Sequence, residues 1–206
     1  MTELLHIHPG NPQARLIEQA VRYFRDGKLI VYPTDSCYAL GCHMGDHRAL
    51  KEIRRIRQTD RNHNFTLVCR DLSEIASYAR VENWSYRYLK SLTPGPYTFV
   101  LRATRDVPRR MQNPRKHTIG IRLPEHPIAQ ALLEALDEPI ISSTLILPGD
   151  ELPMTDPDDI LHRLSGQVDI VVDGGSCGFE PTTVIDMTGD QPEVLRQGKG
   201  ELPHET

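Results

Sequence analysis

The residue with the clearest chemical consequence is Arg122, which stands inside the apolar segment 119–123. A buried guanidinium without a partner is costly, so this pattern predicts a carboxylate or phosphate beside it. Asp35 and Asp173 are candidate partners within the chain, and an internal ion pair is the commoner arrangement for an isolated arginine. An anion supplied from outside is the alternative, and it would make Arg122 a binding residue.

Hydroxyl groups, like Arg122, lie within or next to apolar segments. Thr34 directly follows the apolar run 29–32, and Ser142, Ser143 and Thr144 interrupt a later apolar segment. Such hydroxyls can bind a phosphate or carboxylate, or they can bond neighbouring backbone. Ligands of open α/β sheets gather where strands deliver their loops. We therefore expect Thr34, Ser142 and Thr144 at a site for an anionic ligand.

The charge of the chain is divided unevenly. Residues 1–127 hold 21 lysines and arginines against 12 acidic residues, a net charge of +9, whereas residues 128–206 hold 3 against 16, a net charge of −13. Two basic clusters in the first part contain almost no acid. They indicate either solvated faces or a phosphate-binding surface. The arginines that we expect to contact RNA in the second case are Arg54, Arg55, Arg61, Arg109 and Arg110.

Several common classes of site are not indicated. The sequence has no P-loop, no G-x-G-x-x-G run and no recognisable Ser-His-Asp set. Its four cysteines form no C-x-x-C pair, which favours free thiols in a reducing compartment and predicts no zinc site. No stretch of 18 apolar residues and no signal-like start are present, so we expect a cytoplasmic protein without a membrane span.

Strand-like and helix-like segments alternate through the middle of the chain. Helices are predicted from Asn11-Pro12 to Gly27, after Asp46, over 71–78, 83–92 and about 128–135, and from Asp156-Pro157 to Leu164. Strands are predicted over 29–32, 65–69, 97–101, 119–123, 139–146, 168–172, 182–187 and 194–196. These elements indicate one mixed α/β domain over residues 1–206, with a twisted, largely open sheet and helices on its faces.

Six short motifs in this order resemble the YrdC-like family, which includes the threonylcarbamoyl-AMP synthases. They are Pro33-Thr34-Asp35-Ser36-Cys37-Tyr38-Ala39-Leu40-Gly41, Pro94-Gly95-Pro96-Tyr97-Thr98, Gly120-Ile121-Arg122-Leu123-Pro124-Glu125-His126-Pro127, Asp173-Gly174-Gly175, Thr182-Thr183-Val184-Ile185-Asp186 and Leu195-Arg196-Gln197-Gly198. The resemblance spans nearly the whole chain. It implies a sheet with a concave, positive cavity.

The same resemblance implies ligands and roles. The ligands are ATP or its adenylate product, L-threonine, bicarbonate and Mg²⁺, with a link to tRNA modification and an affinity of relatives for double-stranded RNA. Thr34 and Tyr38 would belong to the amino-acid pocket, and Arg122 would hold the amino acid's carboxylate. Thr183 and Arg196 would lie at the nucleotide phosphates.

The chain departs from the family's pattern at two places. The synthases carry a Lys-x-Arg before the third strand, where this chain has Arg57-Gln58-Thr59, and a Ser-x-Asn where it has Thr144-Leu145-Ile146. Arg57 is then the predicted catalytic and nucleotide-binding residue, with the charge of lysine but a different geometry. Two hypotheses follow: an enzyme that handles a threonylcarbamoyl adenylate, and a non-catalytic protein that binds double-stranded RNA or tRNA.

Overall fold

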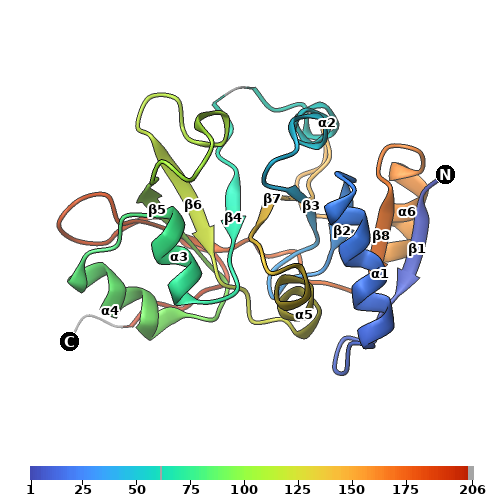
Figure 1. The fold of residues 1–206 in the computed structure, drawn as a ribbon, viewed down its shortest axis with the longest axis horizontal. Helices are drawn as coiled ribbons and strands as arrows, with labels where there is room; N and C mark the ends of the chain where they lie inside the picture. The colour runs from blue at the N-terminus through green and yellow to red at the C-terminus, as the bar shows by residue number, and fades with distance from the viewer. Residues whose placement is uncertain (61, 204–206) are drawn as a thin grey trace.

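The computed structural model describes residues 1–60 and 62–203, and in this part of the chain one ten-stranded sheet carries helices on its faces (Figure 1). The strands are β1 (Glu3–His6), β2 (Ile30–Tyr32), β3 (Ala39–His43), β4 (Thr66–Val68), β5 (Tyr97–Arg102), β6 (Thr118–Arg122), β7 (Ile140–Thr144), β8 (Ile170–Asp173), β9 (Thr183–Asp186) and β10 (Glu193–Arg196). The helices are α1 (Ala14–Arg25), α2 (His47–Arg57), α3 (Leu72–Tyr78), α4 (Asn83–Leu92), α5 (Pro127–Leu136), α6 (Pro157–Leu164) and the 3-10 turn η1 (Arg109–Met111).

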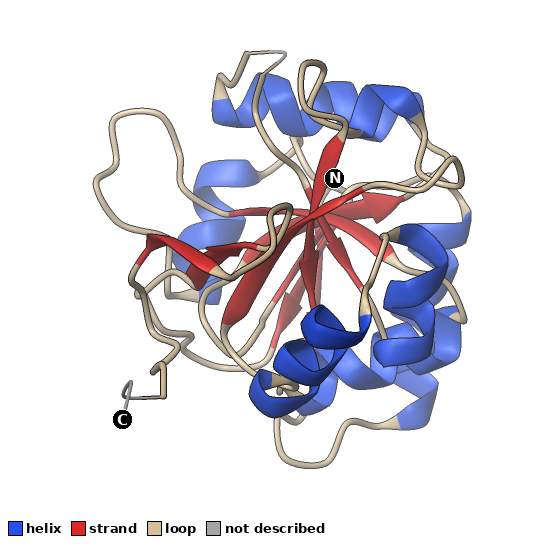
Figure 2. Cartoon of the chain, turned by 90° about the vertical axis from the view of Figure 1, so that its left-hand side faces the viewer, coloured by secondary structure: helices blue, strands red, loops and turns tan. Residues whose placement is uncertain are grey.

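The sheet is mixed and open, as predicted. Its strand order is β1-β8-β2-β3-β7-β4-β6-β5-β9-β10, with parallel pairing between β1 and β8, β8 and β2, β4 and β6, and β5 and β9. Seen along the sheet, the strands cross as a fan with helices above and below them (Figure 2). Because adjacent strands are rotated by about −20 to −25°, loops from distant strands can approach one another.

The two faces of the sheet bury different side chains. Ile30 and Tyr32 on β2 pack with α1 and α5, whereas Val31 between them joins the larger core that includes residues of α2 and α6. Alternation of this kind follows from the two-residue period of a strand. Neighbouring polar residues on one strand are therefore delivered to opposite faces, and this decides which of them can meet in the site.

Helix starts were predicted well where a side chain caps the backbone. Asp46 accepts hydrogen bonds from the backbone N–H groups of Arg48 and Ala49 at 2.8 and 2.9 Å, which confirms it as the cap of α2. The predicted start of α1 at Asn11-Pro12 is wrong, because α1 begins at Ala14. Residues 8–11 instead form a turn in which Nδ1 of His8 accepts from the N–H groups of Gly10 and Asn11.

Two strands were not predicted. The sequence of β3 contains Gly41, which weakens a strand pattern, yet a Cβ there would lie 2.7 Å from Cε1 of Tyr32. The position therefore needs glycine for close packing of β2 against β3. The second missed strand, β1, is short and is held by its parallel pairing with β8. Among the described residues, no helix is both long and apolar enough to cross a membrane.

Candidate functional site: two arginine clusters on either side of β7

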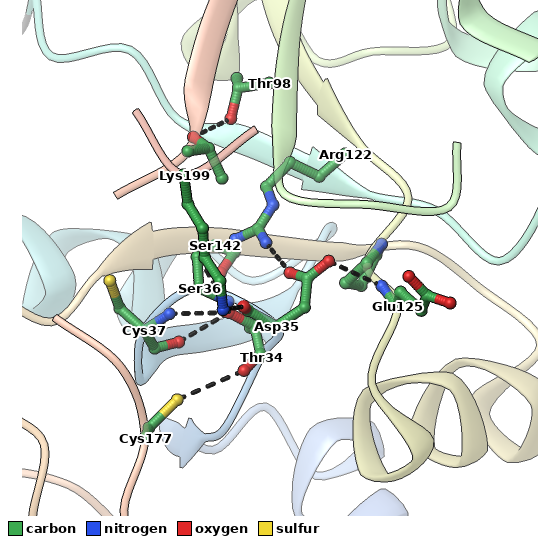
Figure 3. A network of polar contacts seen from close by, with 12 residues as sticks. Thr34, Asp35, Ser36, Cys37, Thr98, Arg122, Glu125, Ser142, Cys177 and Lys199 are labelled. Carbon is green, nitrogen blue, oxygen red and sulfur yellow. Dashed lines mark hydrogen bonds and ion pairs between the residues drawn. The ribbon is translucent and has the colours of Figure 1, made fainter. Parts of the chain in front are cut away.

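Arg122 ends β6 and is buried, with 7% of its surface exposed. Its Nη2 donates to Oδ1 of Asp35 at 2.5 Å, and the other carboxylate oxygen of Asp35 accepts from the backbone N–H of Glu125 at 2.8 Å (Figure 3). Of the two internal partners predicted, Asp35 is the one observed. Asp173 instead bonds Nδ1 of His6 at 2.6 Å.

The ion pair leaves part of the Arg122 guanidinium unused. Its Nε is buried and has no hydrogen-bond partner within the described residues. Nearly all buried polar groups in proteins have a partner, so this N–H is a candidate donor to a ligand or to water. The internal ion pair and an external anion are thus compatible at the same guanidinium.

A narrow recess beside Arg122 collects hydroxyl groups from several strands. Its lining includes Ser36, Tyr38, Thr66, Thr98, Arg122, Ser142, Ser143, Thr144 and Thr182. The recess has a volume of about 20 Å³, which is room for about one water molecule. A larger hollow of about 420 Å³ is lined by Thr34, Asp35, Glu125, His126 and Lys199, among others. Asp35 faces the larger hollow and bonds Arg122 of the recess, so the two spaces adjoin at this ion pair.

The larger hollow carries charges of both signs. Asp35 and Glu125 supply carboxylates, and Lys199 reaches in from the C-terminal segment, where its Nζ donates to the backbone oxygen of Asp35 at 2.5 Å (Figure 3). Burial lowers the pKa of His126, so its imidazole is neutral at pH 7. Sequence reasoning missed Lys199, whose place in a polar tail gave no signal of its position.

Three of the predicted hydroxyls are engaged by the protein itself. The hydroxyl of Thr34 donates to the backbone oxygen of Cys37 at 2.7 Å and closes its own turn. Tyr38 donates to the backbone oxygen of Gly175 at 2.5 Å, and burial raises the pKa of its phenol. Ser142 accepts from the hydroxyl of Tyr32 at 2.9 Å. Thr144 lines the recess and is half-buried. These side chains shape the recess, and their contact with a ligand stays a prediction.

Thr183 lies away from the recess, and its neighbour Thr182 lines it instead. Thr183 is fully buried; its hydroxyl donates to the backbone oxygen of Gly200 at 2.6 Å and accepts from the N–H of Gly198 at 3.0 Å. Thr182 Oγ1 is 2.7 Å from Thr98 Oγ1. Strand alternation explains the difference, since only one of two adjacent threonines can face the ligand side.

Arg196 also belongs to this region. Its Nη2 and Nε donate to the backbone oxygen of Thr182 at 2.8 and 3.2 Å. Burial lowers the pKa of its guanidinium, which nevertheless stays charged at neutral pH. Arg196 is therefore connected, through Thr182, to the same recess that Arg122 lines. A nucleotide-binding role for Arg196 stays a prediction.

A second cluster forms on the α2 side of β7 and is centred on Arg57. Nη1 of Arg57 donates to Oγ of Ser143 at 2.6 Å, and its Nε donates to the backbone oxygen of Ile146 at 3.2 Å. Nε2 of His63 lies 3.1 Å from the same Ser143 hydroxyl. Burial lowers the pKa of Arg57, and no carboxylate within the described chain pairs with it.

The two clusters meet at consecutive residues of β7. Ser142 faces Tyr32 and the α1 side, whereas Ser143 faces Arg57 and the α2 side. Arg57 is thus not in contact with Arg122, but Ser143, which accepts from Arg57, also lines the recess beside Arg122.

The arginines predicted to contact RNA are only partly gathered on one surface. Arg54 places its guanidinium 4.9 Å from the Phe65 ring centroid and donates to the backbone oxygen of Arg110 at 3.3 Å. This contact joins the two basic clusters of the sequence. Arg55 pairs with Glu52 at 2.8 Å, Arg109 and Arg110 are exposed on η1, and Arg61 lies outside the described residues.

The chain is similar over most of its length to known proteins of one family. The family model Sua5/YciO/YrdC, described as "Telomere recombination", matches residues 22–198. The Escherichia coli (strain K12) protein YciO is 54% identical over 202 residues, covering 98% of both chains. Its crystal structure superposes with a TM-score of 0.94 and the same coverage.

One more distant relative has an activity in its name, and another was solved with a bound amino acid. A threonylcarbamoyl-AMP synthase of Chromobacterium violaceum is 33% identical over 191 residues, covering 91% of this chain and 96% of the relative. The structure of Pyrococcus abyssi Sua5 complexed with L-threonine is 26% identical with a TM-score of 0.87, covering 96% of this chain and 58% of that one. With its open mixed sheet, its buried Arg122 and these matches, the chain belongs to the Sua5/YciO/YrdC family.

Proposed function

We propose that this chain binds an amino acid and an adenine nucleotide together and forms or processes a threonylcarbamoyl adenylate. The observation that carries the proposal is the buried guanidinium of Arg122: this residue lines a recess of hydroxyl groups, and its Nε has no partner in the described structure. A carboxylate from an amino acid would satisfy that donor without displacing Asp35. The complex of Pyrococcus abyssi Sua5 with L-threonine supports L-threonine as this amino acid.

The Arg57 cluster supports the nucleotide half of the proposal. A half-buried guanidinium with no carboxylate partner favours an anionic ligand, and a phosphate group matches both its charge and its fork of donors. Arg122 would then hold the amino acid and Arg57 the phosphates, and the two ligands would meet near Ser143, which contacts Arg57 and also lines the recess beside Arg122.

In the synthetic direction the amine of threonine combines with bicarbonate to give a carbamate and water. The carbamate oxygen attacks the α-phosphorus of ATP, the bond to the β-phosphate oxygen breaks, and pyrophosphate leaves. Arg57 would stabilise charge on the transferring group, which is the main contribution that preorganised donors make. Mg²⁺ would arrive with the phosphates, because the described residues contain no group of three side chains suited to a cation.

Space in the site constrains the binding mode. A recess of about 20 Å³ cannot hold threonine, so the amino acid must lie mainly in the adjoining hollow of about 420 Å³. Its carboxylate would reach Arg122 past Asp35, and its ammonium or carbamate would face Lys199 and Glu125. We expect the recess to widen on binding.

The test is pyrophosphate release by the purified protein with ATP, Mg²⁺, bicarbonate and L-threonine. We expect release to require all three substrates and to fall about 100- to 1,000-fold in Arg57→Gln, the range seen when one preorganised donor is removed. Arg163→Gln is a matched control, because Arg163 pairs with Asp150 at the surface. No release, together with no turnover of supplied adenylate and no saturable binding of L-threonine or AMP, would contradict the proposal.

A second candidate function, binding of double-stranded RNA, is favoured by the contact between Arg54 and Arg110 that joins the basic clusters. Arg109→Glu with Arg110→Glu tests it on exposed residues, whereas Arg54 packs on Phe65 and its reversal would disturb the core. We expect the affinity for duplex RNA to fall steeply with salt and to be lost in the double variant. Binding that is insensitive to salt would argue against this function.

A further inference from the structure

The Arg57 cluster also contains the imidazole of His63, to which the proposed function assigns no role in ligand binding. His63 is half-buried, follows α2 by six residues and lies at 3.1 Å from the Ser143 hydroxyl that Arg57 also contacts. Its ring packs edge-on against Phe65, with ring centroids 5.3 Å apart, and Arg54 lies over the same phenyl ring. The imidazole is therefore held in one orientation by contacts on two sides.

The charges around His63 are mainly positive. Arg57 and Arg54 from α2 act on it, Asp60 is the acidic group that opposes them, and Ser143 and Phe65 contribute no charge. Burial, then Arg57 and Arg54, lower the pKa of His63 to about 4. The ring is consequently neutral at pH 7, and the Ser143 hydroxyl, which already accepts from Arg57, can donate its proton to Nε2.

This arrangement changes when an anion enters. A phosphate-like group beside Arg57 would cancel the positive field that keeps His63 neutral, and an imidazolium would add a charge-assisted hydrogen bond to it. By linkage, an anion that favours protonated His63 must itself bind more tightly at lower pH.

We propose that His63 is a proton-coupled ligand for the anion bound at Arg57 and Ser143, so that binding of a phosphate-like group takes up one proton at this imidazole. This inference rests on the proposed function, because it deepens the phosphate half of the same site. The Arg57 cluster should therefore prefer doubly charged oxyanions, because two negative charges can balance the positive charges of Arg57 and of a His63 imidazolium.

Inorganic sulfate is the appropriate probe, because it does not titrate between pH 6 and pH 8 and cannot supply a pH dependence of its own. We expect the sulfate affinity of the wild-type protein, measured by calorimetry, to rise as the pH falls, by at most about tenfold per pH unit. His63→Gln keeps a donor and an acceptor but cannot ionise, so its sulfate affinity should not change with pH. His47→Gln is the control, since His47 is exposed at the first position of α2.

A second measurement needs no variant. In the free protein, the NMR signals of the His63 ring should not titrate above about pH 5, given its pKa of about 4. With saturating sulfate the titration midpoint should move to higher pH. Sulfate binding that depends on Arg57 but not on pH would overturn the role of His63 while leaving the phosphate site intact. No sulfate binding at any pH, or binding unaffected by Arg57→Gln, would overturn the proposed phosphate site itself.

Discussion

Thr183→Val tests whether this threonine holds the C-terminal segment or touches the nucleotide. The valine keeps the approximate shape but removes the hydroxyl, which now donates to the backbone oxygen of Gly200 and accepts from the N–H of Gly198. Thr183 is fully buried and Gly200 is buried as well, so water cannot easily replace the lost bonds. The N–H of Gly198 would be left unsatisfied, whereas the backbone oxygen of Gly200 would keep the hydrogen bond from Nε2 of Gln197 at 2.8 Å.

The expected cost follows from the one backbone group that loses its partner, the N–H of Gly198. A buried donor without a partner costs about 1 to 3 kcal/mol, so we expect the free energy of unfolding to fall by about 1 to 3 kcal/mol. With a urea m-value of about 2 to 3 kcal/mol/M, the denaturation midpoint would drop by about 1 M.

Urea denaturation and amide hydrogen exchange at Gly198 are the assays. The control is Thr188→Val, because Thr188 is half-buried and bonds the nearby Asp186 in an accessible turn. We expect Thr183→Val to lose protection at Gly198 and the control to keep it. Unchanged stability and protection, combined with weaker AMP binding, would refute the structural role and support the phosphate contact that the resemblance implies.

Three further perturbations have definite expectations. Arg122→Met should lower the free energy of unfolding by about 3 to 5 kcal/mol, because it strands the buried carboxylate of Asp35, and Arg122→Met with Asp35→Leu should recover most of this loss in urea titrations. Gly200→Ala should destabilise the protein by about 1 to 3 kcal/mol in the same assay, since the added Cβ would lie 2.4 Å from Cε1 of Tyr97. The folded-state pKa of His63, about 4, lies below its ordinary value of 6.5. Protons therefore bind the unfolded chain first, and stability should fall as the pH drops from 6.5 to 4, by at most about 1.4 kcal/mol per pH unit, a slope that His63→Gln should reduce.

The fold could be predicted because its signals are local. The cap at Asp46 and the helix that follows it, α2, depend on neighbouring residues, and both were confirmed. The errors arise where a distant contact decides the structure. Gly41 is accommodated within β3 because the ring of Tyr32 packs against it. Helix α1 begins at Ala14, after the predicted start, because His8 accepts hydrogen bonds within the preceding turn. Neither contact has a signature at the affected residues.

The site was predicted less completely, and strand parity is the main reason. A carboxylate partner for Arg122, either Asp35 or Asp173, followed from the cost of burying a guanidinium, and the pair with Asp35 is observed, while the ligand role of Arg122 stays a prediction. Which of Thr182 and Thr183 faces the recess depends on the register of β9 beside β5, which the sequence does not state. Lys199 enters the hollow only because the C-terminal segment folds back across the sheet.

The departures from the family's motifs gain a physical meaning in the Arg57 cluster. Where the synthases carry Ser-x-Asn, Leu145 is fully buried in the core and the backbone oxygen of Ile146 accepts from Nε of Arg57. Ser143 accepts from Nη1, so the protein itself uses two of the five guanidinium N–H donors, and the others remain for a ligand. An arginine held in this way presents the remaining N–H groups of Nη1 and Nη2 in a fixed orientation, with a single positive charge. A doubly charged phosphate needs a second positive charge, which must then come from a neighbouring residue. In the described structure His63 is placed to provide this charge by taking up a proton when the phosphate binds.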